Sequence, residues 1–264
     1  MKCTIGVLLL LIAGILVGLA PAVSTAQDPK LIEAGREVYD TYCIVCHGEK
    51  GDGKGLTGII HRAQKSGMVI SIYPRDLTAG MFKFRSTSTG YLPTDDDLLK
   101  IVTNGIPRSG MPSHKDLSAE ERKAVVEYVK IFSKRWREEK QAGTPIKIGK
   151  APGYVGTEAS VERGKVLYLD MVECFKCHGR TGLGDGPSSQ DLKDNWGDKS
   201  LAFDFTSGPL KGGTTPEDIY RTFVTGLDGT PMPSYEESLN EKQRWDLVSY
   251  CLELMKGRKT VAEK

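Results

Sequence analysis

Two cysteines and a histidine recur at one spacing in this chain of 264 residues, and they are the residues best suited to chemistry. The stretch Cys43-Ile44-Val45-Cys46-His47 is matched later by Cys174-Phe175-Lys176-Cys177-His178. Thiols three positions apart lie within about one helical turn, so both can reach the vinyl groups of one porphyrin and form thioethers. The histidine that follows places an imidazole nitrogen beneath the iron. The pattern predicts two c-type haem attachment sites, held by Cys43, Cys46, Cys174 and Cys177, with His47 and His178 as iron ligands.

Other uses of paired cysteines fit this sequence less well. In zinc sites, two Cys-x-x-Cys pairs usually lie about 15–20 residues apart, whereas these pairs are more than a hundred residues apart. A redox pair of the thioredoxin type needs a βαβ context, which the helical patterns around both motifs do not offer. Two matches in similar surroundings also argue against a chance occurrence.

The composition is typical of a soluble globular protein long enough for two domains, with 39% hydrophobic and 27% charged residues. A formal net charge of +2 without a block of basic residues gives no footprint for nucleic-acid binding. Four of the six cysteines belong to the two motifs. The remaining two, Cys3 and Cys251, argue against a disulfide framework.

The N-terminus has the pattern of an export signal. Lys2 supplies a positive charge, Ile5 to Ala20 form an apolar run, and Pro21 ends it. Small residues ending at Ala26 then offer a cleavage site, so we predict a signal peptide over residues 1–26. The alternative is an uncleaved membrane anchor, although the run is slightly short of the roughly 18 apolar residues expected for a span.

Past this segment the chain repeats one pattern of elements. Apolar residues at Leu31, Ala34, Val38 and Tyr42 predict an amphipathic helix that runs into the first motif. A corresponding helix precedes the second motif, and a glycine-rich loop follows each histidine. Since no convincing alternation of apolar residues appears anywhere, little sheet is expected.

Both copies continue with two further predicted helices. A threonine followed by acidic residues indicates a helix start at Thr94 and at Thr215. Each copy then closes with a longer helix that has its own capping residues. These closing helices are predicted from Leu117 to about Trp136 and from Leu239 to about Lys256.

Two methionines, Met111 and Met232, are predicted to fill the open face of each iron. Each lies in a Met-Pro-Ser sequence, in a loop before the closing helix. A thioether is soft and favours Fe(II), so methionine ligation raises the reduction potential. The only histidines outside the motifs are His61 and His114, both in the first copy, and we interpret them as solvent-facing or haem-edge residues. The other methionines are interpreted as packing residues.

From Leu31 to Lys256 the chain resembles a di-haem member of the class I cytochrome c family, with a Cys-x-x-Cys-His motif, a later methionine and a closing helix in each copy. The resemblance implies a mainly α fold with little sheet. It consists of two tandem class I cytochrome c-like helical domains, each wrapped around one covalent haem. The expected domains are residues 27–136 and 160–264, joined by a linker over 137–159.

The family commonly has a glycine eight residues and an aromatic residue four residues before the first cysteine. Gly35 and Tyr39 hold these positions in the first copy, so the closing helix is expected to approach Gly35 while Tyr39 packs against Tyr128. The second copy departs from this spacing. There Gly164 and Tyr168 stand ten and six residues ahead of the first cysteine, with Tyr250 available as the aromatic partner.

Both copies are longer than the most compact members of the family. The additional loops, around Ile59 to Arg85 and Gln190 to Gly213, have no purpose that the sequence assigns. Basic residues in or near them are candidates to bind haem propionates. These candidates are Arg75 and Arg85 in the first copy and Lys211 and Arg221 in the second.

The expected function is that of an exported electron-transfer protein rather than an enzyme. Two saturated haems would pass single electrons between a donor and an acceptor protein, with a membrane respiratory complex as one candidate and no small-molecule substrate. The resemblance implies a periplasmic location, because c-type haem is attached on the outer side of the membrane. The alternatives are a haem subunit of a larger oxidoreductase and a di-haem peroxidase-like enzyme. The last would need an open or histidine-switched face, for which His61 is the plausible residue.

Overall fold

The structure is a computed structural model that describes residues 28–63, 67, 69–138 and 143–257. It is mainly helical with one small two-stranded sheet, which confirms the predicted fold class. The predicted signal peptide and Cys3 lie outside the described residues. Within the described part of the chain, no helix combines the length and the apolar character that a membrane span requires.

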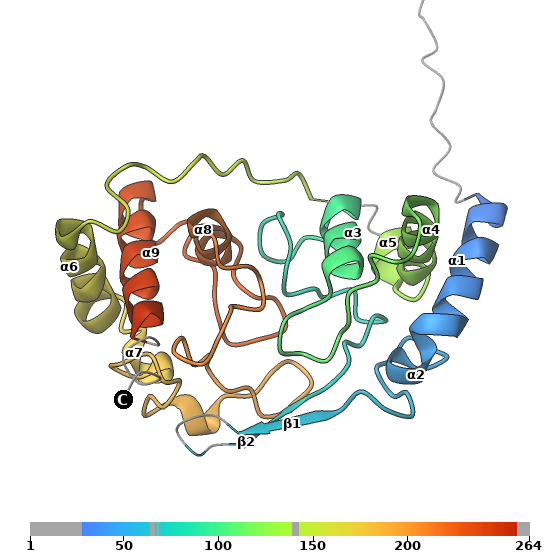
Figure 1. Cartoon of the computed structure of the whole chain (residues 1–264), viewed down its shortest axis with the longest axis horizontal. Helices are drawn as coiled ribbons and strands as arrows, with labels where there is room; N and C mark the ends of the chain where they lie inside the picture. Colours follow the sequence, from blue (N-terminus) through green and yellow to red (C-terminus); the bar gives the residue numbers. More distant parts are fainter. Residues whose placement is uncertain (1–27, 64–66, 68, 139–142, 258–264) are drawn as a thin grey trace, which may run out of the picture.

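The molecule has two halves that repeat the same helical plan, and Figure 1 shows them side by side with their loops facing each other. The elements of the N-terminal half are α1 (Pro29–Tyr42), α2 (Ile44–His47), β1 (Ile60–Ala63), β2 (Val69–Ile72), α3 (Asp95–Asn104), α4 (Ala119–Lys130) and α5 (Lys134–Glu138). Those of the C-terminal half are α6 (Glu158–Val166), the π-helical η1 (Leu167–Met171), α7 (Phe175–His178), the 3₁₀ turn η2 (Ser189–Asp191), α8 (Pro216–Thr225) and α9 (Glu241–Lys256).

Four helices begin with a reciprocal capping arrangement that the sequence predicts. In each, the cap side chain accepts a hydrogen bond from the backbone N–H three residues on, and that residue's side chain accepts one from the cap N–H. Two backbone donors that the helix itself leaves free are thereby satisfied. The pairs are Thr94 with Asp97, Ser118 with Glu121, Thr215 with Asp218, and Asn240 with Gln243.

The first and last long helices of each half cross at a glycine. A Cβ atom on Gly35 of α1 would lie only 2.1 Å from the carbonyl oxygen of Ala124 in α4. A Cβ atom on Gly164 of α6 would lie 2.0 Å from the carbonyl oxygen of Asp246 in α9. Both distances are far inside van der Waals contact, so only glycine lets the two backbones approach this closely. The expected crossing is therefore present in both halves.

A π-helical turn accommodates the different spacing of the second copy. Between Gly164 and the second motif the chain widens into η1, where the Val172 N–H donates to the carbonyl of Leu167. A π turn takes up additional residues without ending the helix. Its result is that Tyr168 donates to the Gly179 carbonyl at 2.6 Å, just as Tyr39 donates to the Gly48 carbonyl at 2.7 Å.

The aromatic partners expected for these tyrosines are also in place. The ring centroids of Tyr39 and Tyr128 are 5.3 Å apart, and those of Tyr168 and Tyr250 are 5.1 Å apart. Such tilted contacts are the favoured geometry of aromatic pairs. Trp245 is buried and stacks on Tyr220 with centroids 4.1 Å apart, so it acts as a packing residue of the C-terminal half.

The closing helix of the N-terminal half is shorter than predicted. We expected it to continue to about Trp136, but α4 ends at Lys130 and α5 begins at Lys134. Between them the hydroxyl of Ser133 accepts from the backbone N–H of Arg135, which starts a new turn. The Arg135 guanidinium then donates to the carbonyl of Gly80 at 2.8 Å, so a tertiary contact overrides the helical periodicity.

The predicted linker, residues 137–159, begins in the last residues of α5 and ends in the first residues of α6. Between these helices, residues 143–157 run as a strap from one half to the other (Figure 1). Its Ile146 N–H donates to the Ser86 carbonyl at 2.8 Å on the N-terminal half. Further along, the Ala151 N–H donates to the Glu217 carboxylate at 2.9 Å on the C-terminal half. These backbone bonds fix the strap to the surface of both halves.

The two additional loops form much of the contact between the halves. The Arg85 guanidinium, whose side chain is fully buried, lies 2.8 Å from the Asp228 carboxylate. Arg75 packs over the Trp196 ring at 4.5 Å from its centroid. In the reciprocal contact Arg108 packs over the Phe203 ring at 5.1 Å. The two additional loops, to which the sequence assigns no role, therefore form contacts between the two copies.

Candidate functional site

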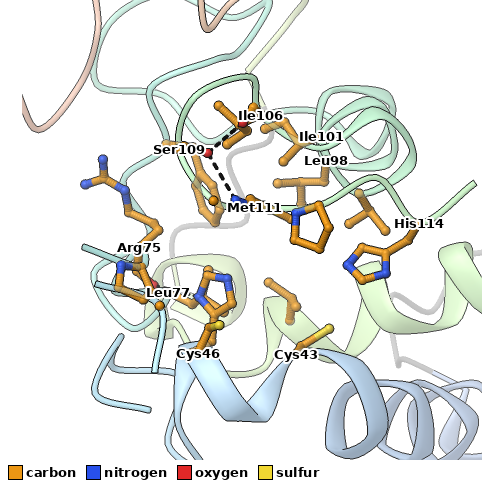
Figure 2. Close-up of a pocket in the computed structure, with 18 of the residues that line it drawn as sticks. Cys43, Cys46, Arg75, Leu77, Leu98, Ile101, Ile106, Ser109, Met111 and His114 are labelled. Atoms are coloured by element: carbon orange, nitrogen blue, oxygen red, sulfur yellow. Dashed lines mark hydrogen bonds between the residues drawn. The ribbon is translucent and has the colours of Figure 1, made fainter. Parts of the chain in front are cut away.

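A cavity in the N-terminal half brings together the predicted site residues Cys43, Cys46, His47 and Met111 (Figure 2). Cys43 lies between α1 and α2, Cys46 and His47 lie in α2, and the methionine comes from the loop after α3. Most of the remaining lining is apolar and comes from α3, α4 and the loop around residues 72–84. Its members include Ile72, Leu77, Phe82, Phe84, Leu98, Ile101, Val102, Ile106, Val125, Val126 and Val129.

A backbone carbonyl orients each motif histidine. The Nδ1 atom of His47 is 3.1 Å from the carbonyl oxygen of Arg75, and that of His178 is 3.2 Å from the carbonyl oxygen of Phe203. Nδ1 must donate in this bond, so Nε2 carries the lone pair that can bind a metal. Burial lowers the pKa of both imidazoles, which favours the neutral form that a metal ligand needs.

The two histidine environments differ in one respect. In the C-terminal half the His178 ring stacks on Phe205 with centroids 4.9 Å apart. In the N-terminal half Leu77 holds the matching position, two residues after Arg75, whose carbonyl accepts the hydrogen bond from His47. The second imidazole is therefore held by a ring as well as by a hydrogen bond.

The four motif cysteines are free thiols in the structure. Burial raises the pKa of Cys43 to about 11 and that of Cys174 to about 12. Within the described residues, no group of three or more His, Cys, Asp or Glu side chains gathers as a zinc site would require.

A short hydrogen-bonded loop presents Met111. The loop follows Gly105 at the end of α3, and the Ile106 N–H donates to the Met111 carbonyl at 3.1 Å. The Ser109 hydroxyl donates to the Ile106 carbonyl at 2.8 Å and accepts from the Met111 N–H at 3.3 Å. Figure 2 shows these two bonds of Ser109 beside the methionine.

The loop that presents Met232 has the same bonds. The Leu227 N–H donates to the Met232 carbonyl at 3.1 Å. The Thr230 hydroxyl donates to the Leu227 carbonyl at 2.7 Å and accepts from the Met232 N–H at 3.3 Å. Met232 packs against the core of the C-terminal half, as Cys174 does. The two methionines therefore have equivalent backbone settings.

The two remaining histidines have different positions. His114 lines the cavity and meets the Tyr42 ring edge-on, with centroids 6.0 Å apart. His61 lies on β1, where its Nδ1 atom is 2.9 Å from the Ser71 hydroxyl, and it is not part of the lining. Of the two, only His114 belongs to the site.

Two family models match the chain, one for each half. Residues 30–129 match cytochrome c oxidase, cbb3-type, subunit III, and residues 161–254 match cytochrome c. A chain of the reducing HAO-like protein complex of Kuenenia stuttgartiensis is similar in structure, with 40% sequence identity and a TM-score of 0.76. That similarity covers 84% of this chain and 96% of the other. The protein belongs to the cytochrome c family. It is a tandem cytochrome with two such domains, and a comparison with curated proteins gave no match.

The residues of this cytochrome fit haem c. The first cavity offers two thiols, a neutral imidazole with a free Nε2 and an apolar lining. Among the described residues, the same lining contains the basic residues Arg75, Lys83 and Lys211 but no carboxylate, which suits the two propionates of a haem. A haem held there by Cys43, Cys46 and His47 would supply an iron centre that gains and loses one electron.

Two of the four basic residues proposed for propionates have other partners. The Arg85 guanidinium donates to the Phe82 and Thr225 carbonyls and pairs with Asp228 between the domains. Arg221 pairs with Asp218 on its own helix. We expected Lys211 in the second site, but it lines the first cavity. The sequence reasoning missed Lys83 entirely, because no periodicity marks a cation in an irregular loop.

Proposed function

We propose that this cytochrome is an exported di-haem electron carrier. It would transfer single electrons between redox partners in a respiratory or periplasmic chain. One haem would be attached to Cys43 and Cys46 and ligated by His47 and Met111. The other would be attached to Cys174 and Cys177 and ligated by His178 and Met232. With a histidine and a methionine as ligands, each iron would have no open position and would change valence without binding a substrate.

The observation that carries the proposal is the equivalence of the two methionine loops. Each has the same three hydrogen bonds around its methionine. A stiff loop holds the thioether in one place and limits rearrangement when the iron changes valence. The proposed organisation is a signal peptide over 1–26, domains over 27–136 and 160–264, and a linker over 137–159. Cleavage of the signal would leave the mature protein in the periplasm.

Spectroscopy on mature protein tests the ligands. We expect mass spectrometry to find two covalent haems and the ferric protein to show the near-infrared band of methionine-ligated iron. Met111→Ala and Met232→Ala should each remove about half of the band, since each haem contributes one thioether. Met171→Ala, which changes an exposed methionine, is the matched control and should leave the band intact. Fewer than two haems, or rapid cyanide binding by the wild-type protein, would contradict the proposal.

A second candidate is a haem subunit of a larger oxidoreductase. The similar chain from Kuenenia stuttgartiensis belongs to a protein complex, which favours this alternative. A free carrier should separate from its partners at moderate salt, because docking between charged surfaces is screened. Persistent co-purification of one redox protein at that salt concentration would favour the subunit.

A further inference from the structure

The lining of the first cavity includes one residue of the other domain. Lys211 belongs to the loop between η2 and α8 of the C-terminal domain, yet it lines the cavity that contains Cys43 and Met111. The other residues that line this cavity belong to the N-terminal domain. The second domain therefore closes part of the first domain's site.

Two contacts hold the Lys211 loop in this position. Before the lysine, the Ser207 hydroxyl accepts a hydrogen bond from the Arg108 guanidinium of the N-terminal domain. After it, Gly212 lies so close to Phe84 that a Cβ atom on the glycine would be 3.0 Å from the Phe84 Cδ1 atom. Phe84 itself lines the cavity. Because the loop is held on both sides of Lys211, this residue stays at the cavity.

The described residues that line the cavity carry an excess of positive charge. Among the described residues, none of Arg75, Lys83 and Lys211 forms a salt bridge with a carboxylate. Burial, with repulsion from the neighbouring cations, lowers the pKa of Lys83 to about 7 and that of Lys211 to about 8. Asp194 attracts Arg75 and Lys83, but the charges that act on Lys211 are all positive, namely Arg62, Arg75 and Arg108. A partly buried ammonium in these surroundings is unfavourable, so the arrangement favours an anionic ligand beside Lys211.

We propose that Lys211 binds a propionate of the first haem, so that the C-terminal domain contributes a residue to the haem site of the N-terminal domain. This inference rests, as the proposed function does, on haem c being bound. Reduction adds one negative charge to the haem, and a nearby cation stabilises that state. The reduction potential of the first haem would then depend on the contact between the domains.

Spectroelectrochemistry of the full-length holoprotein tests this inference. Each haem should give one reduction transition. Met111→His should lower the reduction potential of the first haem only, so the transition that moves belongs to that haem, and we call it the first wave. Lys211→Gln, made both in the wild type and in the Met111→His variant, should lower the reduction potential of the first haem and leave that of the second haem unchanged. We expect the ratio of oxidised to reduced first haem at a fixed potential to rise about tenfold, which is about 59 mV for a one-electron couple.

Three further variants sharpen the test. Lys211→Arg keeps the charge and should retain a potential near that of the wild type. Lys211→Met keeps the length of the side chain and replaces the glutamine variant if that variant is unstable. Lys256→Gln, an exposed lysine at the end of α9 that is not part of the cavity lining, should change neither wave.

The outcomes separate this inference from the proposed function. An unchanged first wave in Lys211→Gln would overturn it, and so would a shift confined to the second wave, which would assign Lys211 to the haem of its own domain. The near-infrared band of the same samples reports methionine ligation. If that band is absent, the proposed function fails, whereas the shift of the first wave still tests Lys211.

Discussion

Arg85 and Asp228 form a salt bridge of 2.8 Å between the two domains, although 143 positions separate them in the sequence. The arginine side chain is fully buried and that of the aspartate is 13% exposed. The same carboxylate also accepts hydrogen bonds from the Thr89 hydroxyl at 2.7 Å and from the Gly90 N–H at 2.9 Å. One aspartate of the second domain therefore satisfies three donors of the first.

Removing this carboxylate should destabilise the protein strongly. Asp228→Ala leaves the Arg85 charge buried without its counter-charge, and breaking a buried pair in this way costs about 3–5 kcal/mol. We expect a lower urea midpoint, measured by circular dichroism on holoprotein. Glu253→Ala breaks an exposed pair with Lys256 and should cost less than about 1 kcal/mol. Equal losses in the two variants would contradict the importance of the interdomain pair.

Adding a methyl group at the helix crossings should also destabilise the fold. In Gly35→Ala and Gly164→Ala the new Cβ atom would collide with a carbonyl of the facing helix. The clash should outweigh the better helix propensity of alanine and lower stability by about 1–3 kcal/mol. Thermal unfolding measures the effect. Gly153→Ala is the control, since a Cβ atom there meets nothing within 4 Å. Equal midpoints of thermal unfolding for all three variants would contradict the importance of the two helix crossings.

The methionine loop should respond to a change at Gly105. This residue has φ of 66°, and a Cβ atom on it would lie 2.6 Å from the Met111 carbonyl oxygen. Gly105→Ala should displace the loop and weaken the near-infrared methionine band of the first haem. Gly156→Ala imposes a similar backbone strain, because Gly156 has φ of 83°, but nothing lies within 4 Å of its Cβ position. That control should keep the full band; a full band in Gly105→Ala as well would show that the loop tolerates the methyl group.

The acid stability of the second domain should depend on Asp246. Burial alone would raise the pKa of this carboxyl, but hydrogen bonds from Arg163, Lys242 and Ser160 outweigh burial and hold the pKa below its ordinary 3.8. A lowered folded-state pKa gives stability that is present above the unfolded value of about 3.9 and is lost as the pH falls through the folded value. The stability gap between wild type and Asp246→Asn should therefore shrink below about pH 4.

Urea midpoints from pH 3 to pH 7 measure that gap. Glu253→Gln, which alters an exposed ion pair with Lys256, should differ from wild type by less than about 1 kcal/mol at every pH. A gap for Asp246→Asn that stays constant down to pH 3 would contradict the electrostatic explanation and point to packing instead.

Local signals carried most of the fold prediction. The caps at Thr94 and Asn240 act within four residues, so the sequence itself contains both partners. The same holds for the two motifs and for the methionine loops, whose bonds are all local. Features of this kind can be predicted because chain connectivity brings the interacting groups together.

Long-range contacts could not be predicted in this way. No pattern near Lys211 indicates that it reaches the cavity of the other copy, because its position depends on how two irregular loops pack. The pair of Arg85 and Asp228 is hidden for the same reason. The π turn at Leu167–Met171 is a different case. The altered spacing of Gly164 is visible in the sequence, but the way the backbone absorbs it is not.

The reciprocal packing of Arg75 on Trp196 and of Arg108 on Phe203 makes each copy of the repeat depend on the other. Arg75 and Phe203 are the residues whose carbonyls hold the two motif histidines. Each copy therefore packs against the side chain of the residue whose carbonyl positions the other's motif imidazole. Copies with this relationship are no longer interchangeable modules, because excising one would uncover the side chain of the residue that supports the remaining histidine.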